Sequence, residues 1–313
     1  MQCERVTLEN EFILAKDIRA ACELAGVSED AIVPSIASLD TIQDKLRQRQ
    51  ALQVAGVPSP NAVPLEADPS GAIADIGFPM MIKTRFGGYD GKGARSIKNL
   101  RELEQNRSAW EGGGWLAEQF VPFRRELAVM VYVGPFGMGS FPTMETVQVD
   151  HVCDLVFPAG VDASEAAYAA VEAVGGRGLY GVELFELADG SFQVNEIAPR
   201  PHNTGHYTLD WGGVSQFEQH IRLVMGWPII EPVGAETCMA NLLGRSPSGC
   251  YSDAISAALA IPNTYFHWYG KEIAKPGRKM GHVNAVGTGC VERATQARKA
   301  FYDGWTSLDS SNQ

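Results

Sequence analysis

The feature that most constrains the fold of this 313-residue chain is a pair of β-rich stretches at 180–186 and 192–197, separated by the tight turn Ala-Asp-Gly at 188–190. This pattern predicts an antiparallel hairpin whose side chains are registered across the two strands. Glu183 and Glu196 would then face one another. Because Mg²⁺ prefers carboxylate oxygens, with phosphates and waters completing its octahedron, the hairpin predicts a site for nucleotide-bound magnesium.

Asn195 adds an amide oxygen next to Glu196. The alternative is that Glu183 and Glu196 are ordinary solvated strand residues, which is the commoner position for glutamate. The surrounding run 195–203, Asn-Glu-Ile-Ala-Pro-Arg-Pro-His-Asn, favours the functional interpretation, because neither an apolar core nor a plain surface strand requires this mixture.

A glycine-rich segment at 87–93, Gly-Gly-Tyr-Asp-Gly-Lys-Gly, lies between expected strands at 80–85 and 115–120. Glycines let backbone N–H groups approach a polyphosphate closely. The segment is not a Walker A loop, because the Gly-x4-Gly-Lys-Ser/Thr spacing is absent and no helix follows directly. A flexible hairpin tip is the alternative. Together with Lys83 on the preceding strand and the carboxylate hairpin downstream, the glycines predict a lid over phosphates.

Charge and cysteine content narrow the classes of partner. The 26 basic and 37 acidic residues give a formal charge of -11, which disfavours nonspecific binding to nucleic acid or anionic membranes. The six cysteines form no CxxC pair, so neither a zinc spacing nor a disulfide framework is predicted. No apolar run approaches the length of about 20 residues that a membrane helix needs. We therefore expect a soluble, cytoplasmic protein that binds neither nucleic acid nor membranes.

Periodicity and turn residues predict mixed α/β structure. Helices are expected at 15–25, 42–55, 164–174 and 216–225, and further strands at 4–8, 126–133 and 147–157. In the helix at 42–55, Leu46 and Leu52 are expected to point inward, and Lys45, Arg47 and Arg49 outward.

In their order along the chain, these residues resemble the ATP-grasp superfamily, whose two lobes hold ATP between antiparallel sheets. The matching positions are Lys45, Lys83, the loop 87–93, Glu118-Gln-Phe-Val121, Glu126, Glu183 and Asn195-Glu196. More narrowly, several segments are similar to signatures of the N5-carboxyaminoimidazole ribonucleotide synthetase family. These segments are 87–93, 118–127, 195–203, 215–220, 267–271 and 277–282. The resemblance runs from about Val6 to His282.

The resemblance implies an α/β (α+β) ATP-grasp fold with a small C-terminal mixed domain. It divides the chain into a remnant of an N-terminal Rossmann-like domain at 1–40, an ATP-grasp domain at 41–245 and a C-terminal domain at 246–313. The segment 6–11 is similar to the end of the N-terminal domain in this family, and Glu9 or Glu11 is expected within reach of the substrate.

The resemblance also implies a ligase of purine biosynthesis that uses ATP, Mg²⁺ and bicarbonate to carboxylate aminoimidazole ribonucleotide through carboxyphosphate, and that forms a homodimer. Glu183 and Glu196 would hold the metal. The implied nucleotide-binding residues are Lys45, Lys83, Gly88, Tyr89, Asp90, Gly91, Lys92, Gly93, Ala94, Glu118, Gln119, Phe120, Val121, Glu126, Gln148, Asn195 and Glu196.

On the acceptor side, the family match implies Tyr89, Asn203, Lys271 and Arg278 as substrate residues. Asp90, Lys271 and Arg278 are the candidate catalytic residues, with Asp90 as the base. Lys271 and Arg278 lie seven residues apart and can converge on one anion. Simple solvation of both side chains is the alternative.

One segment departs from the family pattern. The sequence reads Glu-Thr-Val-Gln at 145–148, where the family tends to show Glu-Asn-x-His, so Gln148 or His151 would take the place of the nucleotide-site histidine. Two other functions stay open on sequence grounds. One is an ATP-grasp carboxylate-amine ligase with a different acceptor. The other is a truncated ATP-binding remnant without activity of its own, which acts only by pairing with a partner chain.

Overall fold

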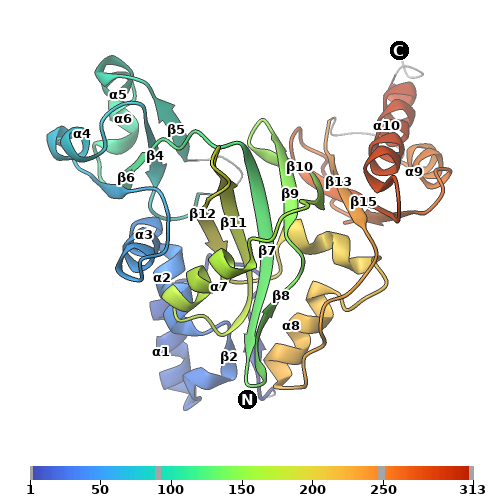
Figure 1. Ribbon diagram of the computed structural model, residues 1–313, viewed down its shortest axis with the longest axis horizontal. Helices are drawn as coiled ribbons and strands as arrows, with labels where there is room; N and C mark the ends of the chain where they lie inside the picture. Colours follow the sequence, from blue (N-terminus) through green and yellow to red (C-terminus); the bar gives the residue numbers. More distant parts are fainter. Residues whose placement is uncertain (1–2, 89–92, 246–250, 310–313) are drawn as a thin grey trace. The chain divides into compact units, whose positions relative to one another are not determined.

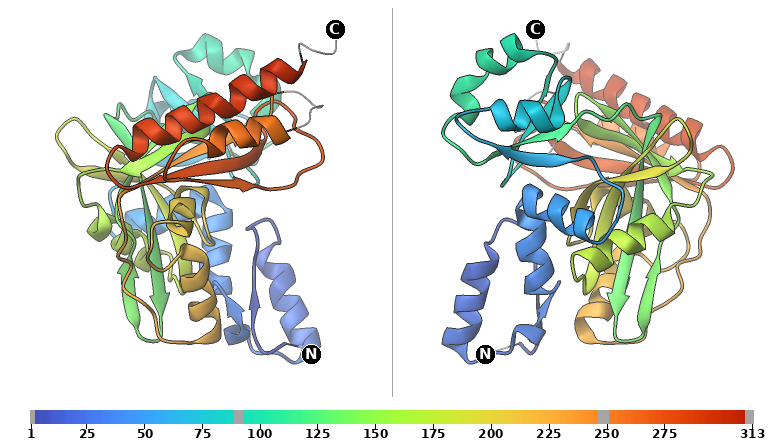
Figure 2. Two further views of the ribbon diagram at one scale, coloured as in Figure 1. Left: turned by 90° about the vertical axis from the view of Figure 1, so that its right-hand side faces the viewer. Right: turned by 60° about the vertical axis from the view of Figure 1, so that its left-hand side comes forward.

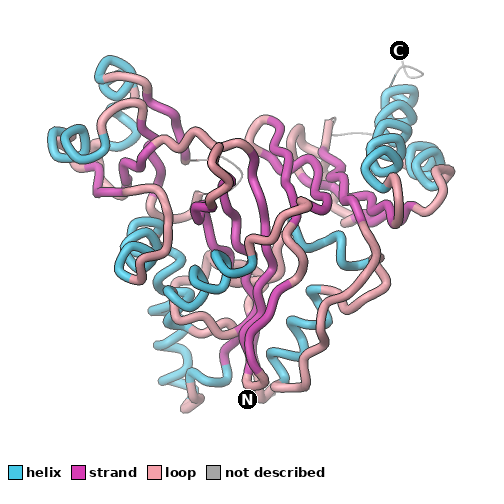
Figure 3. The backbone as a smooth tube through the Cα atoms, viewed as in Figure 1, coloured by secondary structure: helices cyan, strands magenta, loops and turns pink. Residues whose placement is uncertain are grey.

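The computed structural model describes residues 3–88, 93–245 and 251–309 (Figures 1 and 3). The chain forms two compact units. The first comprises Met1–Thr143, Val161–His202 and Phe217–Ile230, and the second comprises Met144–Gly160, Asn203–Gln216 and Glu231–Gln313. Both units combine helices with antiparallel strands, as the sequence predicts.

The first unit opens with a small parallel pair of strands covered by helices. Its elements are β1 (Val6–Thr7), α1 (Ala15–Ala25), the 3₁₀ helix η1 (Glu29–Ala31), β2 (Ile32–Val33) and α2 (Ile36–Gln43). The helix expected at 15–25 is confirmed, and it ends at Gly26, which adopts φ 62°. A left-handed residue after the last turn is a common way to terminate a helix, and glycine adopts it without steric cost.

Helix α3 (Lys45–Val54) carries residues of the candidate site. Asp44 caps it, because the Asp44 side chain accepts a hydrogen bond from the Leu46 amide at 3.0 Å. Leu46 and Leu52 are buried as predicted. The prediction that Arg49 points outward is wrong, because only 5% of this residue is exposed.

A four-stranded antiparallel sheet in the first unit has the order β3-β6-β4-β5. Its strands are β3 (Ala62–Leu65), β4 (Met80–Thr84), β5 (Ala94–Ile97) and β6 (Trp115–Gln119). Short helices accompany it: α4 (Ser70–Ile76), α5 (Leu100–Gln105) and α6 (Arg107–Trp110). Met80, Ile82 and Trp110 belong to the apolar core of this sheet, which places Lys83 and Glu118 on a rigid support.

The other strands of the first unit form the order β12-β11-β7, and β8 also pairs with β7. These elements are β7 (Arg125–Gly134), β8 (Gly137–Ser140), β11 (Gly178–Glu186) and β12 (Phe192–Ala198), with helices α7 (Ser164–Ala173) and α8 (Gln216–Met225). Helix α7 contacts β7, β11 and β12, which supports the hairpin β11–β12 from one side (Figure 1).

The second unit contains strands in the order β9-β10-β13-β15-β14. Its elements are β9 (Met144–Val149), β10 (Val152–Pro158), the 3₁₀ helix η2 (Asn203–Leu209), β13 (Thr237–Leu243), α9 (Ser252–Leu259), β14 (Thr264–Trp268), β15 (Lys279–Val286) and α10 (Cys290–Asp309). Helices α9 and α10 lie side by side, and α10 packs on β13 and β15 (Figure 2, left).

The single strand predicted at 147–157 is wrong, because this segment is a hairpin of β9 and β10. Asp150 and His151 form its turn with φ values of 50° and 64°. Aspartate and histidine tolerate the left-handed region better than most residues, so the turn forms without the glycine that would have signalled it.

The structure predicts how stability responds to acid. His220 is buried, its Nε2 lies 2.7 Å from Thr7 Oγ1, and burial lowers the pKa of His220 to about 4. Histidine in an unfolded chain has a pKa of about 6.5, so the unfolded state takes up the proton first as pH falls. We expect the contribution of neutral His220 to be complete above about pH 6.5 and to fall below it by up to about 1.4 kcal/mol per pH unit.

Urea unfolding from about pH 7.5 down to about pH 5 tests this expectation. The His220→Gln variant, which does not titrate at this position, should show a shallower loss of unfolding free energy than the wild type. His151→Asn, at an exposed turn, is the matched control and should keep the wild-type slope. Equal slopes for His220→Gln and the wild type would contradict the expectation.

Among the helices of the described residues, none has the length and apolar character needed to cross a membrane.

Candidate active site

The carboxylate hairpin forms as the sequence pattern predicts. Strands β11 and β12 pair antiparallel, and Glu183 lies directly opposite Glu196. Their connection closes where the Gly190 amide donates to the Leu187 carbonyl at 3.0 Å, with Gly190 at φ 83°. The two carboxylates therefore come from neighbouring strands of one rigid hairpin.

A β-bulge on β12 orients the polar residues. The register shifts after Glu183, so that Asn195 is an extra residue on β12. Val194 and Ile197 are buried, whereas Asn195 and Glu196 are both only partly buried. In a regular strand, consecutive side chains alternate between the two faces, and a bulge breaks this alternation. The amide of Asn195 and the carboxylate of Glu196 therefore both stay out of the core.

His202 lies next to Glu183. Its Nε2 atom is 3.8 Å from Glu183 Oε1. A Cβ atom at Gly181 on β11 would come within 2.6 Å of His202 Cβ, closer than real contacts allow. Glycine at position 181 is therefore what lets the imidazole lie against the strand beside the carboxylate.

Lys45, the first residue of α3, forms an ion pair with Glu196. Burial would raise the pKa of Glu196, but the charge of Lys45 and its hydrogen bond outweigh this effect and lower it. Glu196 is therefore ionised at neutral pH, the form in which a carboxylate binds a divalent cation.

Glu118 on β6 is buried, with 2% of the residue exposed. Its Oε2 accepts a hydrogen bond from Arg49 Nε at 2.8 Å, and its Oε1 accepts one from Lys83 Nζ at 2.6 Å. Burial alone would raise the pKa of Glu118, but the charges of Arg49 and Lys83 lower it to about 2. The carboxylate stays charged because two cations enclose it.

Arg49 also contacts the bulge of β12. Its Nη1 donates to the Val194 carbonyl at 3.2 Å, and its Nη2 donates to the Asn195 carbonyl at 2.6 Å. Sequence reasoning missed this residue. The available signal was its spacing, because Arg49 follows Lys45 by four positions, and residues so spaced share one face of a helix.

The glycine-rich segment is anchored at both ends. The Thr84 amide donates to the Gly93 carbonyl at 2.8 Å, and Gly93 has φ 85°. At the other end, the Arg85 carbonyl accepts from the Lys45 amide at 2.9 Å, and the Arg85 guanidinium pairs with Asp44. Four predicted site residues between these anchors, Tyr89, Asp90, Gly91 and Lys92, lie outside the described residues.

A cavity of about 240 Å³ joins the start of the glycine segment to the carboxylate hairpin. Its lining residues are Glu11, Phe12, Leu14, Ile42, Gln43, Lys45, Arg85, Phe86, Gly87, Gly88, Glu196 and Ile197. Lys45, Gly88 and Glu196, which were predicted separately from sequence, therefore share one cavity.

Arg200 and Glu11 form a bidentate ion pair in the first unit. Arg200 Nη2 donates to Glu11 Oε1 at 2.9 Å, and Arg200 Nε pairs with Glu11 Oε2. Gln43 holds the segment that carries Glu11. Its Nε2 donates to the carbonyls of Glu11 at 2.7 Å and Ile13 at 2.6 Å, and its Oε1 accepts from the Ala15 amide at 3.1 Å. Glu11 is thus held in place as the partner of Arg200.

The predicted base- and ribose-binding residues lie at the end of β6 and the start of β7. Gln119 and Phe120 are exposed, Val121 is buried, and Glu126 is partly buried opposite Phe185. Ala94 opens β5 and pairs with Lys83. Their roles toward the nucleotide stay predictions.

Of the predicted acceptor residues, Asn203, Lys271 and Arg278 belong to the second unit. Lys271 Nζ donates to the Lys279 carbonyl at 2.7 Å and lies 5.3 Å from the centre of the Tyr269 ring. Arg278 Nη1 donates to the Ile273 carbonyl at 2.9 Å. The two cations thus have different carbonyl partners, and their convergence on one anion stays a prediction.

Asn203 exchanges side-chain hydrogen bonds with Asn241 in the second unit, at 3.1 and 2.7 Å. Gln148 lies opposite Cys153 in the β9–β10 hairpin, and His151 occupies the turn. That Gln148 or His151 contacts the nucleotide stays a prediction.

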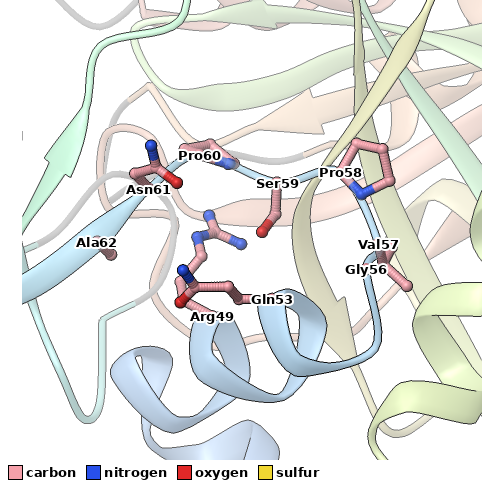
Figure 4. Close-up of a pocket in the computed structure, with 9 residues that line it drawn as sticks. All are labelled: Arg49, Gln53, Gly56, Val57, Pro58, Ser59, Pro60, Asn61 and Ala62. Carbon is pink, nitrogen blue, oxygen red and sulfur yellow. The ribbon is translucent and has the colours of Figure 1, made fainter.

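A second cavity, of about 230 Å³, opens beside Arg49 (Figure 4). Its lining residues are Arg49, Gln53, Gly56, Val57, Pro58, Ser59, Pro60, Asn61 and Ala62. The Pro58 carbonyl accepts from the Val194 amide at 2.9 Å, so the linker after α3 is bonded to the bulged strand β12.

The donor set suits a magnesium ion that a nucleotide brings with it. Glu183, Glu196 and Asn195 supply hard oxygen atoms. Within the described ranges, no group of three or more His, Cys, Asp or Glu side chains is arranged to hold a metal by itself. Mg²⁺ commonly binds through one or two carboxylates and takes its other ligands from phosphates and water.

Comparisons with known proteins identify the class. A family model described as "ATP-grasp domain" matches residues 50–217, and one described as "Phosphoribosylaminoimidazole carboxylase C-terminal domain" matches residues 237–296. The fold is that of an ATP-grasp protein, as predicted. The chain is 38% identical over 333 residues to N5-carboxyaminoimidazole ribonucleotide synthase of Synechococcus elongatus, covering 99% of this chain and 82% of that protein. The chain belongs to the N5-carboxyaminoimidazole ribonucleotide synthase family.

Further relatives and solved structures support the same family assignment. Phosphoribosylaminoimidazole carboxylase of Schizosaccharomyces pombe is 36% identical over 91% of this chain, which spans only 54% of that longer protein. Among solved structures, N5-carboxyaminoimidazole synthase of Aspergillus clavatus in complex with ADP and 5-aminoimidazole ribonucleotide matches with a TM-score of 0.84 and 31% identity, covering 98% of this chain and 82% of that one. The Thermotoga maritima synthetase matches with a TM-score of 0.80 and 34% identity, covering 95% and 81% of the two chains.

Proposed function

We propose that this chain carboxylates 5-aminoimidazole ribonucleotide to N5-carboxyaminoimidazole ribonucleotide, consuming ATP and bicarbonate and releasing ADP and phosphate, in purine biosynthesis. The observation that carries the proposal is the opposition of Glu183 and Glu196, with Lys45 paired to Glu196 in the same unit. Family membership and the relatives' ligands, ADP and the aminoimidazole ribonucleotide, support it.

On the nucleotide side, we assign Glu183 and Glu196, with the Asn195 amide, to Mg²⁺, which when bound offsets phosphate charge during phosphoryl transfer. Lys45 and Lys83 bind phosphates as point charges. The segment from Glu118 to Val121 contacts the adenine, and Glu126 contacts the ribose.

The reaction proceeds in two displacements. A bicarbonate oxygen attacks the γ-phosphorus of ATP, ADP leaves, and carboxyphosphate forms. The amine of the ribonucleotide then attacks the carboxyphosphate carbon, phosphate leaves, and the amine proton passes to a base. We assign Asp90 as this base, Lys271 and Arg278 to the anionic intermediate and substrate, and Tyr89 and Asn203 to the acceptor site.

Further parts of the proposal concern organisation. We propose that the protein is a cytoplasmic homodimer. We also propose that the chain divides into an N-terminal segment at 1–40, an ATP-grasp domain at 41–245 and a C-terminal domain at 246–313. Exposed apolar side chains on α8, Phe217, Ile221 and Met225, support a subunit contact. Sedimentation at several protein concentrations tests the oligomeric state.

An ADP-release assay with each substrate omitted in turn tests the reaction. ADP release should require ATP, bicarbonate and aminoimidazole ribonucleotide together. Release with a different acceptor would instead indicate another ATP-grasp ligase. Release with no acceptor at any protein concentration, despite ATP binding, would indicate a nucleotide-binding protein that requires a partner chain.

The Asp90→Asn variant tests the base. We expect it to retain ATP affinity while product formation falls by about 10² to 10⁴, the usual contribution of a general base. Undiminished product formation would remove Asp90 from this role. Asp68→Asn, at an exposed position, is the control and should behave as the wild type.

A further inference from the structure

We propose that Arg49 is a positioning residue of the nucleotide site, which neutralises Glu118 and thereby leaves the positive charge of Lys83 available for phosphate groups. The inference rests on the proposed function, because it takes Lys83 as a phosphate ligand. Arg49 itself need not touch the nucleotide.

The charges around Glu118 do not cancel. One carboxylate is enclosed by two cations, and both of its oxygens are occupied, by Arg49 at 2.8 Å and by Lys83 at 2.6 Å. The side chain of Lys83 is more exposed than that of Arg49, at 16% against 6%. Glu118, Arg49 and Lys83 together therefore carry a net charge of one positive unit. Lys83 is the cation of this group with access to a ligand.

Without Arg49, Glu118 would hold Lys83 in place. A buried carboxylate that loses all its cations is strongly destabilising. If Arg49 were absent, Lys83 would be the sole partner of Glu118, and moving its ammonium toward a phosphate would leave that carboxylate unpaired. With Arg49 present, Glu118 keeps a charged partner whether or not Lys83 moves.

The hydrogen bonds of Arg49 extend beyond Glu118. The same guanidinium donates to the Val194 and Asn195 carbonyls on the bulge of β12. Arg49 therefore links the strand of Glu118 to the strand of Glu196. A planar fork can reach acceptors on two strands at once, whereas the single ammonium of a lysine cannot reproduce all three bonds.

The experiment measures ADP binding to the full chain by calorimetry. We expect Arg49→Met to bind ADP about tenfold or more weakly than the wild type, the usual effect of losing hydrogen bonds to a charged group. Arg49→Lys should regain part of the loss, because it restores a cation to Glu118. Arg47→Met is the matched control, since Arg47 lies on the same helix, is half exposed and pairs with Asp40 at 3.2 Å. It should bind as the wild type.

A comparison of ADP with adenosine, the latter by ligand-observed NMR titration, separates charge supply from structural support. Adenosine has no phosphate, so Arg49→Met should weaken ADP binding several-fold more than adenosine binding. The double variant Arg49→Met/Glu118→Gln should have a higher ratio of ADP affinity to adenosine affinity than Arg49→Met, because Lys83 is then released. The ratio is compared because Glu118 is itself assigned to the adenine. Thermal unfolding checks that each variant is folded, and Arg49→Lys carries the test if Arg49→Met is not.

The outcomes are distinguishable. Failure of the wild type to bind ADP would overturn the proposed function. Wild-type affinity in Arg49→Met, or equal losses for ADP and adenosine, would overturn the inference about Arg49 and leave the proposed function standing. An unchanged ratio of ADP affinity to adenosine affinity in the double variant, relative to Arg49→Met, would also overturn the inference, because it would show that Glu118 does not restrain Lys83.

Discussion

Replacing Glu196 by glutamine is expected to lower kcat/KM for ATP by at least about 100-fold, the usual scale for removing one preorganised electrostatic contact to a transition state. The amide is uncharged, so it binds Mg²⁺ weakly, and Lys45 loses its ion-pair partner. The concentration of Mg²⁺ that gives half-maximal activity should rise in parallel. Steady-state kinetics across a magnesium titration measures both effects.

The control for this prediction is Glu172→Gln, at an exposed position on α7, the helix that packs against the same strands. It should leave both the activity and the magnesium requirement unchanged. A Glu196→Gln enzyme with the wild-type magnesium requirement would show that Glu196 does not serve the metal. The magnesium assignment for the hairpin would then be wrong.

The second large effect is expected on stability, at Asp44. This buried carboxylate caps α3 through the Leu46 amide at 3.0 Å and pairs with Arg85, where Nε donates at 3.0 Å. Asp44→Ala removes the cap and leaves Arg85 without this partner. We expect the free energy of unfolding to fall by about 2–4 kcal/mol, measured by urea denaturation.

Asp44→Asn separates the two contributions, because asparagine is also a good helix cap but carries no charge for Arg85. It should lose clearly less stability than Asp44→Ala. The matched control is Asp40→Ala, since Asp40 is partly exposed and pairs with Arg47 and Arg19. Removing a partly exposed pair should cost no more than about 1 kcal/mol. Equal effects at positions 40 and 44 would contradict the expectation.

Much of the site was predictable because local rules set it. The alternating pattern and the tight turn at 188–190 predict the hairpin, and the structure has it. Counted from the turn, a regular register would place Glu183 opposite Asn195, and the extra residue on β12 brings Glu196 there instead. The turn at Asp150 and His151 was not predictable in the same way, because neither residue carries the local signal of glycine. A local rule succeeds only where the residue type itself restricts the backbone.

The orientation of Asn195 and Glu196 depended on more than the strand pattern. Alternation alone would send neighbouring side chains to opposite faces. The extra residue that breaks this alternation is defined by the pairing of β12 with β11, and the bulge is bonded to Arg49 from another part of the chain. Both are tertiary relations, so a single strand read by itself does not reveal them.

The sequence by itself determined the order of the motifs, the hairpin, the glycine-rich loop and the family, because these follow from residue types at short spacing. Only the tertiary structure decided which cations meet which carboxylates. Arg49 and Glu118 are separated by 69 positions, and Lys45 and Glu196 by 151. Whether an arginine on a polar helix face is solvated or buried depends on the charge that folding brings against it, and helical periodicity carries no information about that charge.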